Sequence, residues 1–334
     1  MIPAAGSPAF RRLTGTGLAA CLVGGLVHGG WATIATRRGH TGFERHSVHC
    51  GSGNIIAYHL RPGASDGPVL VCEAGLMSTS TAWLLIADHL DPAVTVVVYD
   101  RAGYRGSLRR CPDTYSLSES VNDLVDVVTD ALGVRRTCVL AGHSLGGYLV
   151  HRAAATAPDL VKGVILVDPT HPRELLHSPR QRVGARAADM TMRLGPWTLF
   201  FGGGLLLDKK EMFDFARGTA HHRALRLEVS APGTWRAARR EWSRAYAFMM
   251  DGGRPLDRLE VPVSVIAAEL TLRKSPEHRE LLEEYVSSGS RGEIVTIADS
   301  THLSVVSGSG TAAFTAKAME GMLGDGRPEQ REAS

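Results

Sequence analysis

The feature that most constrains this chain is an apolar, β-branched run that leads into Gly142-His143-Ser144-Leu145-Gly146 and then into a helix-forming segment. Gly142 and Gly146 have no Cβ atoms, so the chain can turn sharply from a strand into a helix here. Such a turn exposes the hydroxyl of Ser144 and leaves the backbone N–H of Leu145 free to bind an oxyanion. We therefore predict that Ser144 is a nucleophile and not an ordinary serine in a glycine-rich turn.

Strand-like and helical segments alternate on both sides of this turn. Short apolar runs occur at 69–72, 94–99, 136–141 and 161–167, and apolar residues recur at helical spacing in 81–90, 116–132 and 148–157. Unbroken apolar strands are typical of parallel sheets that are covered on both faces. Before them, two strands at 43–50 and 54–60 predict a hairpin. The predicted fold class is therefore α/β, with a doubly wound, mostly parallel sheet.

The alternation stops after Asp168-Pro169 and resumes at 261–266. The intervening segment has no clear strand and holds most of the aromatic residues. At about 90 residues it is too long for an ordinary connection, and it follows a strand end, where open α/β sheets bind ligands. We predict that it is a mainly helical lid over Ser144. The predicted organisation is an N-terminal segment at 1–40, a core at 41–170 and 259–323, the lid at 171–258 and a flexible tail at 324–334.

The N-terminal segment is predicted to associate with a membrane. Arg11-Arg12 precedes a stretch from Leu13 to Thr36 that contains no Asp, Glu, Lys or Arg. As a helix this stretch would be about 36 Å long, enough to cross a bilayer. We favour a single uncleaved membrane anchor. The alternatives are a secretory signal cleaved near Thr33-Ile34-Ala35, which would export the protein, and a lipoprotein signal ending at Cys21.

Composition excludes several classes of function. The formal net charge is +3 and the arginines are spread along the chain, so we expect no nucleic-acid partner. None of the five cysteines forms a CxxC pair, which argues against a zinc site, and we predict neither a metal nor a cofactor. Cys50 and Cys111 could form a disulfide if the domain lies outside the cytoplasm.

Four motifs make the segment from 43 to 323 resemble the α/β-hydrolase superfamily. They are Glu73-Ala74-Gly75-Leu76, Tyr99-Asp100-Arg101-Ala102-Gly103-Tyr104, the turn around Ser144, and Ser300-Thr301-His302. The resemblance implies an α/β-hydrolase-type sheet with an inserted helical lid, in the branch with a serine nucleophile. It also implies a small-molecule acyl substrate. Haloalkane dehalogenases and epoxide hydrolases of this fold use a carboxylate nucleophile, so the serine argues against those chemistries.

The resemblance also indicates the partners of Ser144. His302 follows a predicted strand, where the family has its catalytic histidine, and an imidazole is suited to act as the base. Two carboxylates compete for the third position: Asp168, which we favour, and Glu269, which follows the next strand of the core. The more usual position for the acid falls near Thr271, which has no carboxylate.

Three neighbouring residues receive lesser roles. His143, inside the turn, is expected to point away from the side chain of Ser144. His171 is the weaker competitor for the role of His302. Asp299 is expected to shape the loop that carries His302.

The resemblance assigns the oxyanion hole to the backbone N–H groups of Leu145 and Leu76. Glu73 is an unusual neighbour, because its carboxylate would oppose the developing negative charge if it pointed inward. The segment Tyr104-Arg105-Gly106-Ser107 departs from the usual family pattern close to the pocket.

The predicted activity is hydrolysis of an ester-type substrate through an acyl-enzyme. Leucines and aromatic residues at 194–207 suggest a lipophilic acyl group, although packing of the lid onto the core would also account for them. The alternatives are a hydrolase of C–C or amide bonds with the same triad, and a catalytically inactive, membrane-tethered scaffold.

Overall fold

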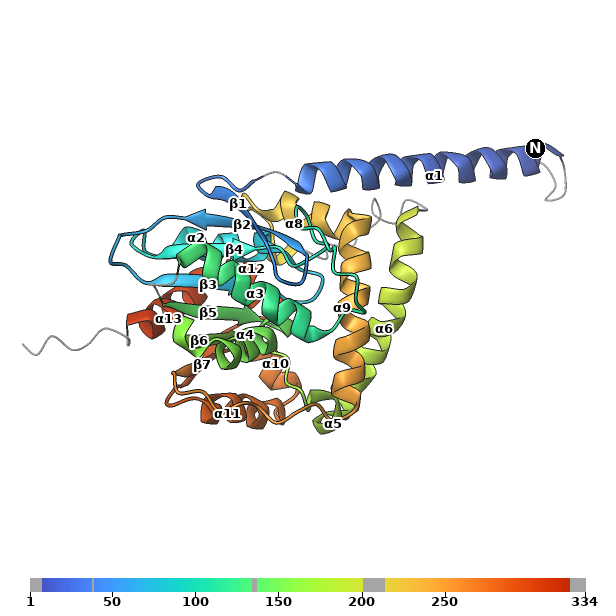
Figure 1. The fold of residues 1–334 in the computed structure, drawn as a ribbon. Coiled ribbons are helices and arrows are strands. Elements are labelled where there is room, and N and C mark those ends of the chain that lie inside the picture. The colour runs from blue at the N-terminus through green and yellow to red at the C-terminus, as the bar shows by residue number, and fades with distance from the viewer. Residues whose placement is uncertain (1–7, 38, 134–136, 201–213, 325–334) are drawn as a thin grey trace, which may run out of the picture.

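The computed structural model describes residues 8–37, 39–133, 137–200 and 214–324, and within α1 (Pro8–Thr36) it describes side chains from Leu22 onward. At its centre is an eight-stranded sheet in the order β1-β2-β4-β3-β5-β6-β7-β8 (Figure 1). The β1–β2 and β2–β4 pairs are antiparallel, and all other neighbours are parallel. The strands are β1 (Glu44–His49), β2 (Ile55–Arg61), β3 (Val69–Glu73), β4 (Thr95–Tyr99), β5 (Cys138–His143), β6 (Val161–Val167), β7 (Val263–Ala268) and β8 (Ile294–Ile297). This arrangement confirms the predicted fold class and the N-terminal hairpin.

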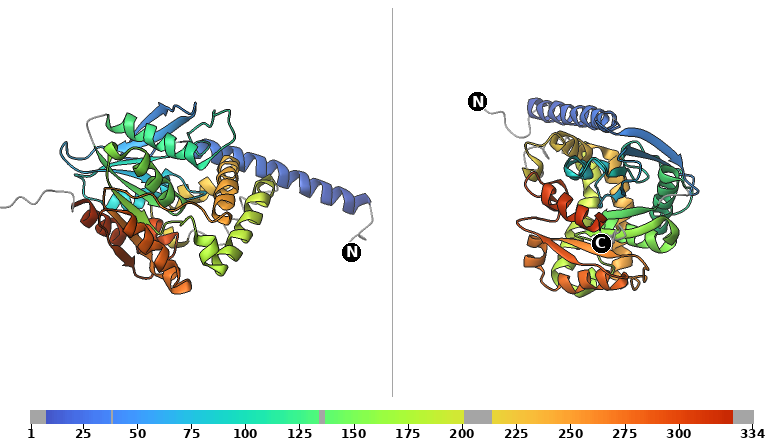
Figure 2. Two further views of the ribbon diagram at one scale, coloured as in Figure 1. Left: turned by 60° about the horizontal axis from the view of Figure 1, so that its bottom comes forward. Right: turned by 90° about the vertical axis from the view of Figure 1, so that its left-hand side faces the viewer.

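Helices cover both faces of the sheet, as Figure 2 shows. Strand residues alternate between the two apolar cores that result: Val71 of β3 packs on one side and Leu70 on the other. Because both faces need apolar side chains, the strands read as unbroken apolar runs. One face carries α3 (Leu117–Leu132), α4 (Leu145–Thr156) and α11 (His278–Ser288), and the other carries α2 (Leu84–His89), α12 (Ser304–Ser307) and α13 (Ala312–Gly324).

The helix α3 begins and ends close to where its sequence predicts. The side chain of Ser116 caps it by accepting a hydrogen bond from the backbone N–H of Glu119. Gly133 ends it with a φ of +63°, a conformation that favours glycine. Local capping chemistry therefore sets the bounds of this helix.

The described part of the chain between β6 and β7 is helical and contains no strand. Its helices α6 (Pro179–Phe200) and α9 (Pro232–Met250) pack so closely that a Cβ atom at Gly195 would lie 1.9 Å from the ring of Trp235. Trp235 also shares a small apolar core with Tyr104 of the main domain. We call this segment the helical insertion; it comprises α5 (Glu174–His177), α6 (Pro179–Phe200), η4 (Asp214–Ala216), α8 (His222–Ser230) and α9 (Pro232–Met250). Part of the predicted apolar stretch, 201–207, and the predicted tail beyond Gly324 lie outside the described residues.

The N-terminal segment forms one helix, α1, that packs on α8 of the helical insertion. Within the residues that the structure describes, no helix combines the length and the apolar character needed to cross a membrane. The predicted transmembrane anchor is therefore not supported.

The four cysteines with described side chains are free thiols, so the disulfide considered between Cys50 and Cys111 is not formed. Cys50, Cys72 and Cys138 are buried, and Cys111 is half-buried. Buried cysteines of this kind pack as small apolar side chains.

Candidate active site

Ser144 lies between the end of β5 and the start of α4, with a backbone φ of 54° and ψ of −124°. The glycines on either side are required by close backbone contacts. A Cβ at Gly142 would lie 2.3 Å from the carbonyl oxygen of Gly146, and a Cβ at Gly146 would lie 2.5 Å from that of Ala74. Only glycines allow the strand and the helix to meet this tightly, and the strained serine is held at the tip of the turn.

The structure brings Ser144, His302 and Asp168 into one hydrogen-bonded series. Nε2 of His302 lies 2.9 Å from Oγ of Ser144, and Nδ1 lies 2.7 Å from Oδ2 of Asp168. Asp168 follows β6, and His302 lies in the loop between β8 and α12. Because Nδ1–H donates to the carboxylate, Nε2 is free to accept the serine proton.

Glu269, the alternative acid, points elsewhere. It is the first residue of α10 (Glu269–Lys274), and its carboxylate accepts a hydrogen bond of 2.8 Å from the backbone N–H of Asp299. Asp299 has a φ of 53°, which fits its expected role in shaping the loop before His302. The geometry therefore favours Asp168 as the partner of His302.

Asp168 is held as an anion by its surroundings. It is buried, and burial opposes its ionisation, but the hydrogen bond and charge of His302 outweigh this and hold the pKa of Asp168 below its usual value. The backbone N–H of Ala268 and the hydroxyl of Thr271 donate two more hydrogen bonds, at 3.1 and 2.8 Å. Thr271, the residue at the usual family position of the acid, thus supports the acid instead of replacing it.

The same pair shifts His302 in the opposite direction. Burial opposes its protonation, yet the hydrogen bond and negative charge of Asp168 raise the pKa of His302 above the ordinary value. An imidazole with a raised pKa is a stronger base, and the adjacent carboxylate would stabilise an imidazolium formed by proton transfer from a serine.

His143 contacts the backbone of His302, and no hydrogen bond links its ring to the hydroxyl of Ser144 in the described structure. Its Nε2–H donates to the backbone carbonyl of His302 at 2.7 Å, and the two rings lie 4.7 Å apart. Burial, followed by the charge of His302, lowers the pKa of His143 to about 3, so this ring is neutral. His171 is also buried, and its ring faces Tyr285 and Glu284. It therefore does not take the place of His302 beside Ser144.

The loop after β3 passes directly over the serine. A Cβ at Gly75 would lie 3.1 Å from Cβ of Ser144 and 3.0 Å from the ring of His143. This contact places the neighbouring Leu76 beside the nucleophile. Leu145, the first residue of α4, has no acceptor for its N–H one turn earlier in its own helix. The two N–H groups assigned to the oxyanion hole therefore come from adjacent segments.

The carboxylate of Glu73 is paired with a cation, so its charge is not left free to oppose an oxyanion. Its carboxylate is almost fully buried and contacts Nη1 of Arg101 at 2.5 Å as well as the hydroxyl of Tyr99. Burial raises the pKa of Glu73 to about 7, against the lowering effect of Arg101. Arg101 also donates hydrogen bonds to the carbonyl groups of Ala74 and Gly75, at 2.5 and 2.9 Å.

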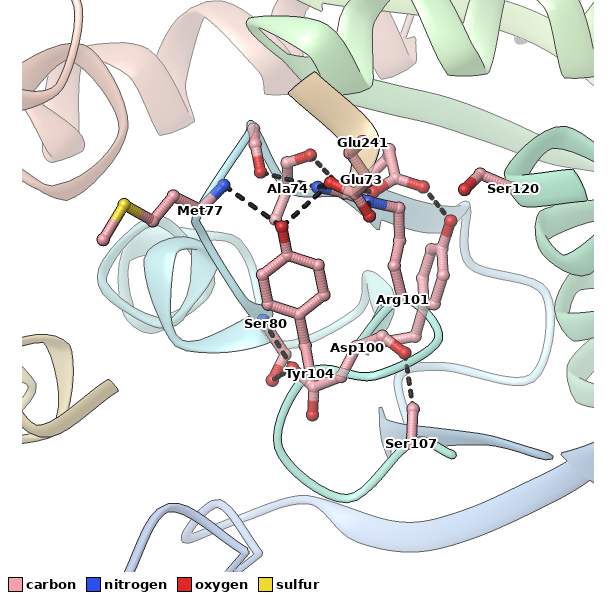
Figure 3. A network of polar contacts seen from close by, with 12 residues as sticks. Glu73, Ala74, Met77, Ser80, Asp100, Arg101, Tyr104, Ser107, Ser120 and Glu241 are labelled. Carbon is pink, nitrogen blue, oxygen red and sulfur yellow. Dashed lines mark hydrogen bonds and ion pairs between the residues drawn. The ribbon is translucent and has the colours of Figure 1, made fainter. Parts of the chain in front are cut away.

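Figure 3 shows how this network continues into the helical insertion. Glu241 of α9 is fully buried and accepts two hydrogen bonds from Arg101, at 2.9 and 2.8 Å. It also accepts one of 2.9 Å from the hydroxyl of Tyr104, and that hydroxyl accepts one of 3.3 Å from the backbone N–H of Met77. Sequence reasoning missed this role of Arg101, although the residue lies in a motif that carries the resemblance.

A cavity of about 400 Å³ opens beside Asp168 and His302. Its lining is rich in polar and charged side chains, which differs from the wholly apolar pocket that a lipophilic substrate would favour. The lining includes Asp168, Thr170, Glu174, Arg180, Gln181, Lys274, His278 and His302.

Among the residues with described side chains, one group offers metal-binding atoms within 4.8 Å of one another: Cys50, Asp123 and Asp126. These atoms already have partners. Asp123 accepts hydrogen bonds from Ser52 and Asn54, at 2.6 and 2.8 Å. Burial raises the pKa of the Cys50 thiol, which disfavours the thiolate that a metal needs. The group therefore fastens the β1–β2 turn to α3.

Comparison with known proteins identifies the family and the fold. The sequence profile of the alpha/beta hydrolase family matches residues 26–314. A putative carbamate hydrolase, RutD, from Enterobacter cloacae is 33% identical over 110 residues, which cover 33% of this chain and 41% of that protein. Protein phosphatase methylesterase 1 from Debaryomyces hansenii is 29% identical over 124 residues, which cover 33% of this chain and 32% of that protein. The chain thus spans about two fifths or less of the length of these relatives.

Among solved structures, a putative epoxide hydrolase from Pseudomonas aeruginosa superimposes with a TM-score of 0.68 at 18% identity. The match covers 85% of this chain and 96% of that one. At this identity the similarity shows a shared fold alone.

Proposed function

The chain belongs to the alpha/beta hydrolase family, and on this basis we propose that it hydrolyses ester-type substrates with Ser144 as nucleophile, His302 as base and Asp168 as acid. The single observation that carries the proposal is the unbroken series of hydrogen bonds from Asp168 through His302 to Ser144. The three residues are separated in the sequence and follow the ends of three different strands, so no local structure requires their side chains to meet.

In the first half of the reaction, Nε2 of His302 takes the proton of Ser144 as Oγ attacks the substrate carbonyl. The N–H groups of Leu145 and Leu76 would bind the oxyanion that develops. His302 then gives the proton to the leaving alcohol, and an acyl-enzyme remains. In the second half, His302 takes a proton from a water molecule as that water attacks the acyl carbonyl. The bond between the acyl carbon and Oγ then breaks, His302 returns the proton to Ser144, and the carboxylic acid leaves.

The helical insertion is proposed to act as a lid that excludes water from this reaction. Its buried Glu241 contacts Arg101, which in turn holds the loop that carries Leu76. The charged lining of the cavity beside Asp168 and His302 supports a substrate that carries polar groups. A lipophilic acyl chain remains an alternative, and a series of esters of increasing acyl length separates the two.

A serine-directed fluorophosphonate probe tests the proposal most directly. We expect labelling of the wild-type protein and none of Ser144→Ala, with hydrolysis of a generic phenyl ester lost in the same variant. Absence of labelling in a folded wild-type protein would favour an inactive scaffold. Cleavage of amides or C–C bonds, with no cleavage of esters, would support the alternative hydrolase chemistry.

A further inference from the structure

In α1, small side chains face the protein and large apolar side chains face outward. This is the opposite of the arrangement expected for a helix on the surface of a water-soluble protein. Small residues face the helical insertion: Ala32 and Thr36 are buried, as are Gly25 and Gly29. A Cβ at Gly29 would lie 3.2 Å from the ring of Pro232, so the contact with the insertion is close. These positions are spaced by four, three and four residues and therefore share one side of the helix.

The opposite side of α1 carries large apolar side chains that are exposed. Among the described residues of this helix, they are Val23, Leu26, Val27, Trp31 and Ile34, with exposed fractions of 44% to 69%. Their spacing again follows one helical face. In Figure 1, α1 lies across one end of the molecule, above α8, and its N-terminal part extends beyond the rest of the protein. We call this face the α1 stripe.

Cationic groups border the α1 stripe. A cavity of about 320 Å³ at the C-terminal end of α1 is lined by Thr33, Thr36 and five arginines. Two of the five, Arg105 and Arg109, already form ion pairs with carboxylates outside the lining, so the remaining three carry the cationic character of the cavity. Two of these arginines, Arg37 and Arg236, are exposed and form no ion pair with any residue that the structure describes. Arg223 of α8 also lies over the ring of Trp31, at 5.9 Å from its centre.

We propose that the α1 stripe and this arginine-lined cavity dock the protein onto an anionic lipid surface, with α1 lying in the interface. The stripe would enter the boundary between headgroups and acyl chains, as apolar faces of interfacial helices do. The cavity would receive the phosphate of a lipid headgroup, and exposed arginines near such a surface add attraction that salt weakens.

The charge of the segment favours a lipid surface over a second copy of the chain. The first 43 residues contain four arginines and no Asp or Glu. Two copies that met through this face would bring like charges together, whereas an anionic bilayer would neutralise them. The observation is independent of the proposed esterase activity, because no residue of the stripe belongs to the triad.

The test is co-sedimentation of the full chain with vesicles, which does not depend on catalysis. Vesicles of phosphatidylcholine alone are compared with vesicles that contain about 30% phosphatidylglycerol, at low and high salt. The stripe variant is Val27→Asp with Ile34→Asp. Its control is Phe314→Asp, because Phe314 on α13 is 65% exposed and lies away from α1. The charge variant is Arg37→Glu with Arg236→Glu, and its control is Arg279→Glu on α11.

We expect the wild-type protein and both controls to bind the anionic vesicles more tightly than the neutral ones. The stripe variant should bind at least about tenfold more weakly, because two apolar side chains no longer enter the lipid. The charge variant should lose the preference for phosphatidylglycerol and the salt dependence. All variants should hydrolyse a soluble ester as the wild type does.

Three outcomes would overturn the proposal. In the first, the wild-type protein sediments with neither kind of vesicle, and in the second, the stripe variant binds as tightly as the wild type. In the third, the wild-type protein does not bind vesicles, and light scattering shows that it forms a dimer which the stripe variant abolishes. That result would assign the stripe to self-association.

Discussion

Nδ1 of His302 donates a hydrogen bond of 2.7 Å to Asp168, a residue that precedes it by 134 positions and follows β6. The strand next in the sheet, β7, ends beside Glu269, yet that carboxylate binds the backbone of Asp299. The carboxylate that binds His302 is therefore the one that follows β6. Thr271, which follows β7, donates a hydrogen bond to that carboxylate.

Substitution of the two carboxylates should separate their roles. Asp168→Asn removes the charge that orients His302 and stabilises the imidazolium, so we expect kcat to fall by about 10⁴-fold. Glu269→Gln is the matched control and should change kcat by only a few-fold, because Glu269 contacts the loop and not the base. Steady-state kinetics on a generic ester measure both. Equal losses in the two variants would contradict the assignment.

The rate should depend on pH through His302. The base acts in its neutral form, so kcat/KM should rise with pH as His302 loses its proton. Because Asp168 raises the pKa of His302, this rise should lie above the ordinary histidine value of about 6.5. In Asp168→Asn the raising influence is absent, and the midpoint should move to lower pH. An NMR titration of the imidazole provides the second readout, and an unmoved midpoint would count against the pairing.

Arg101 should be important for stability as well as for catalysis. In Arg101→Met, the buried carboxylates of Glu73 and Glu241 lose their partner, and breaking such a buried ion pair costs about 3–5 kcal/mol. We expect a corresponding loss in the free energy of unfolding, measured with urea. The control is Arg186→Met, an exposed position on α6.

The conservative variant Glu241→Gln tests whether this network also positions the oxyanion loop. The amide keeps the shape of the side chain but weakens its hold on Arg101. We expect a lower kcat with little change in KM, because the N–H of Leu76 would act mainly on the transition state. A change confined to stability would leave the network a purely structural role.

Two glycines of similar helical context should respond differently to alanine. A Cβ at Gly146 would meet the backbone oxygens of Ala74 and Glu73 at 2.5 and 2.6 Å, so Gly146→Ala should displace the loop over Ser144 and strongly reduce activity. Gly184 on α6 has no atom within 4 Å of a Cβ, so Gly184→Ala should stabilise the protein by about 0.5–1 kcal/mol. Ester hydrolysis and thermal unfolding of both variants check this contrast.

The sequence by itself determined the features that depend on neighbouring residues. The glycines around Ser144, the capped helix ending at Gly133 and the unbroken apolar strands each follow from local sterics, capping or periodicity, and the structure has all of them. These signals also indicated the order of elements, and the resemblance to the α/β-hydrolase superfamily then implied that the loop of His302 would lie at the same strand-end face as Ser144.

Only the tertiary structure decided how distant side chains pair. The preference for Asp168 over Glu269, the burial of Glu241 against Arg101 and the outward face of α1 all depend on how separate segments pack. A local pattern can state that a residue is charged or that a helix has two faces. Which partner neutralises the charge, and which face is covered, is set by contacts between residues more than a hundred positions apart, where burial makes an unpaired charge too costly to keep.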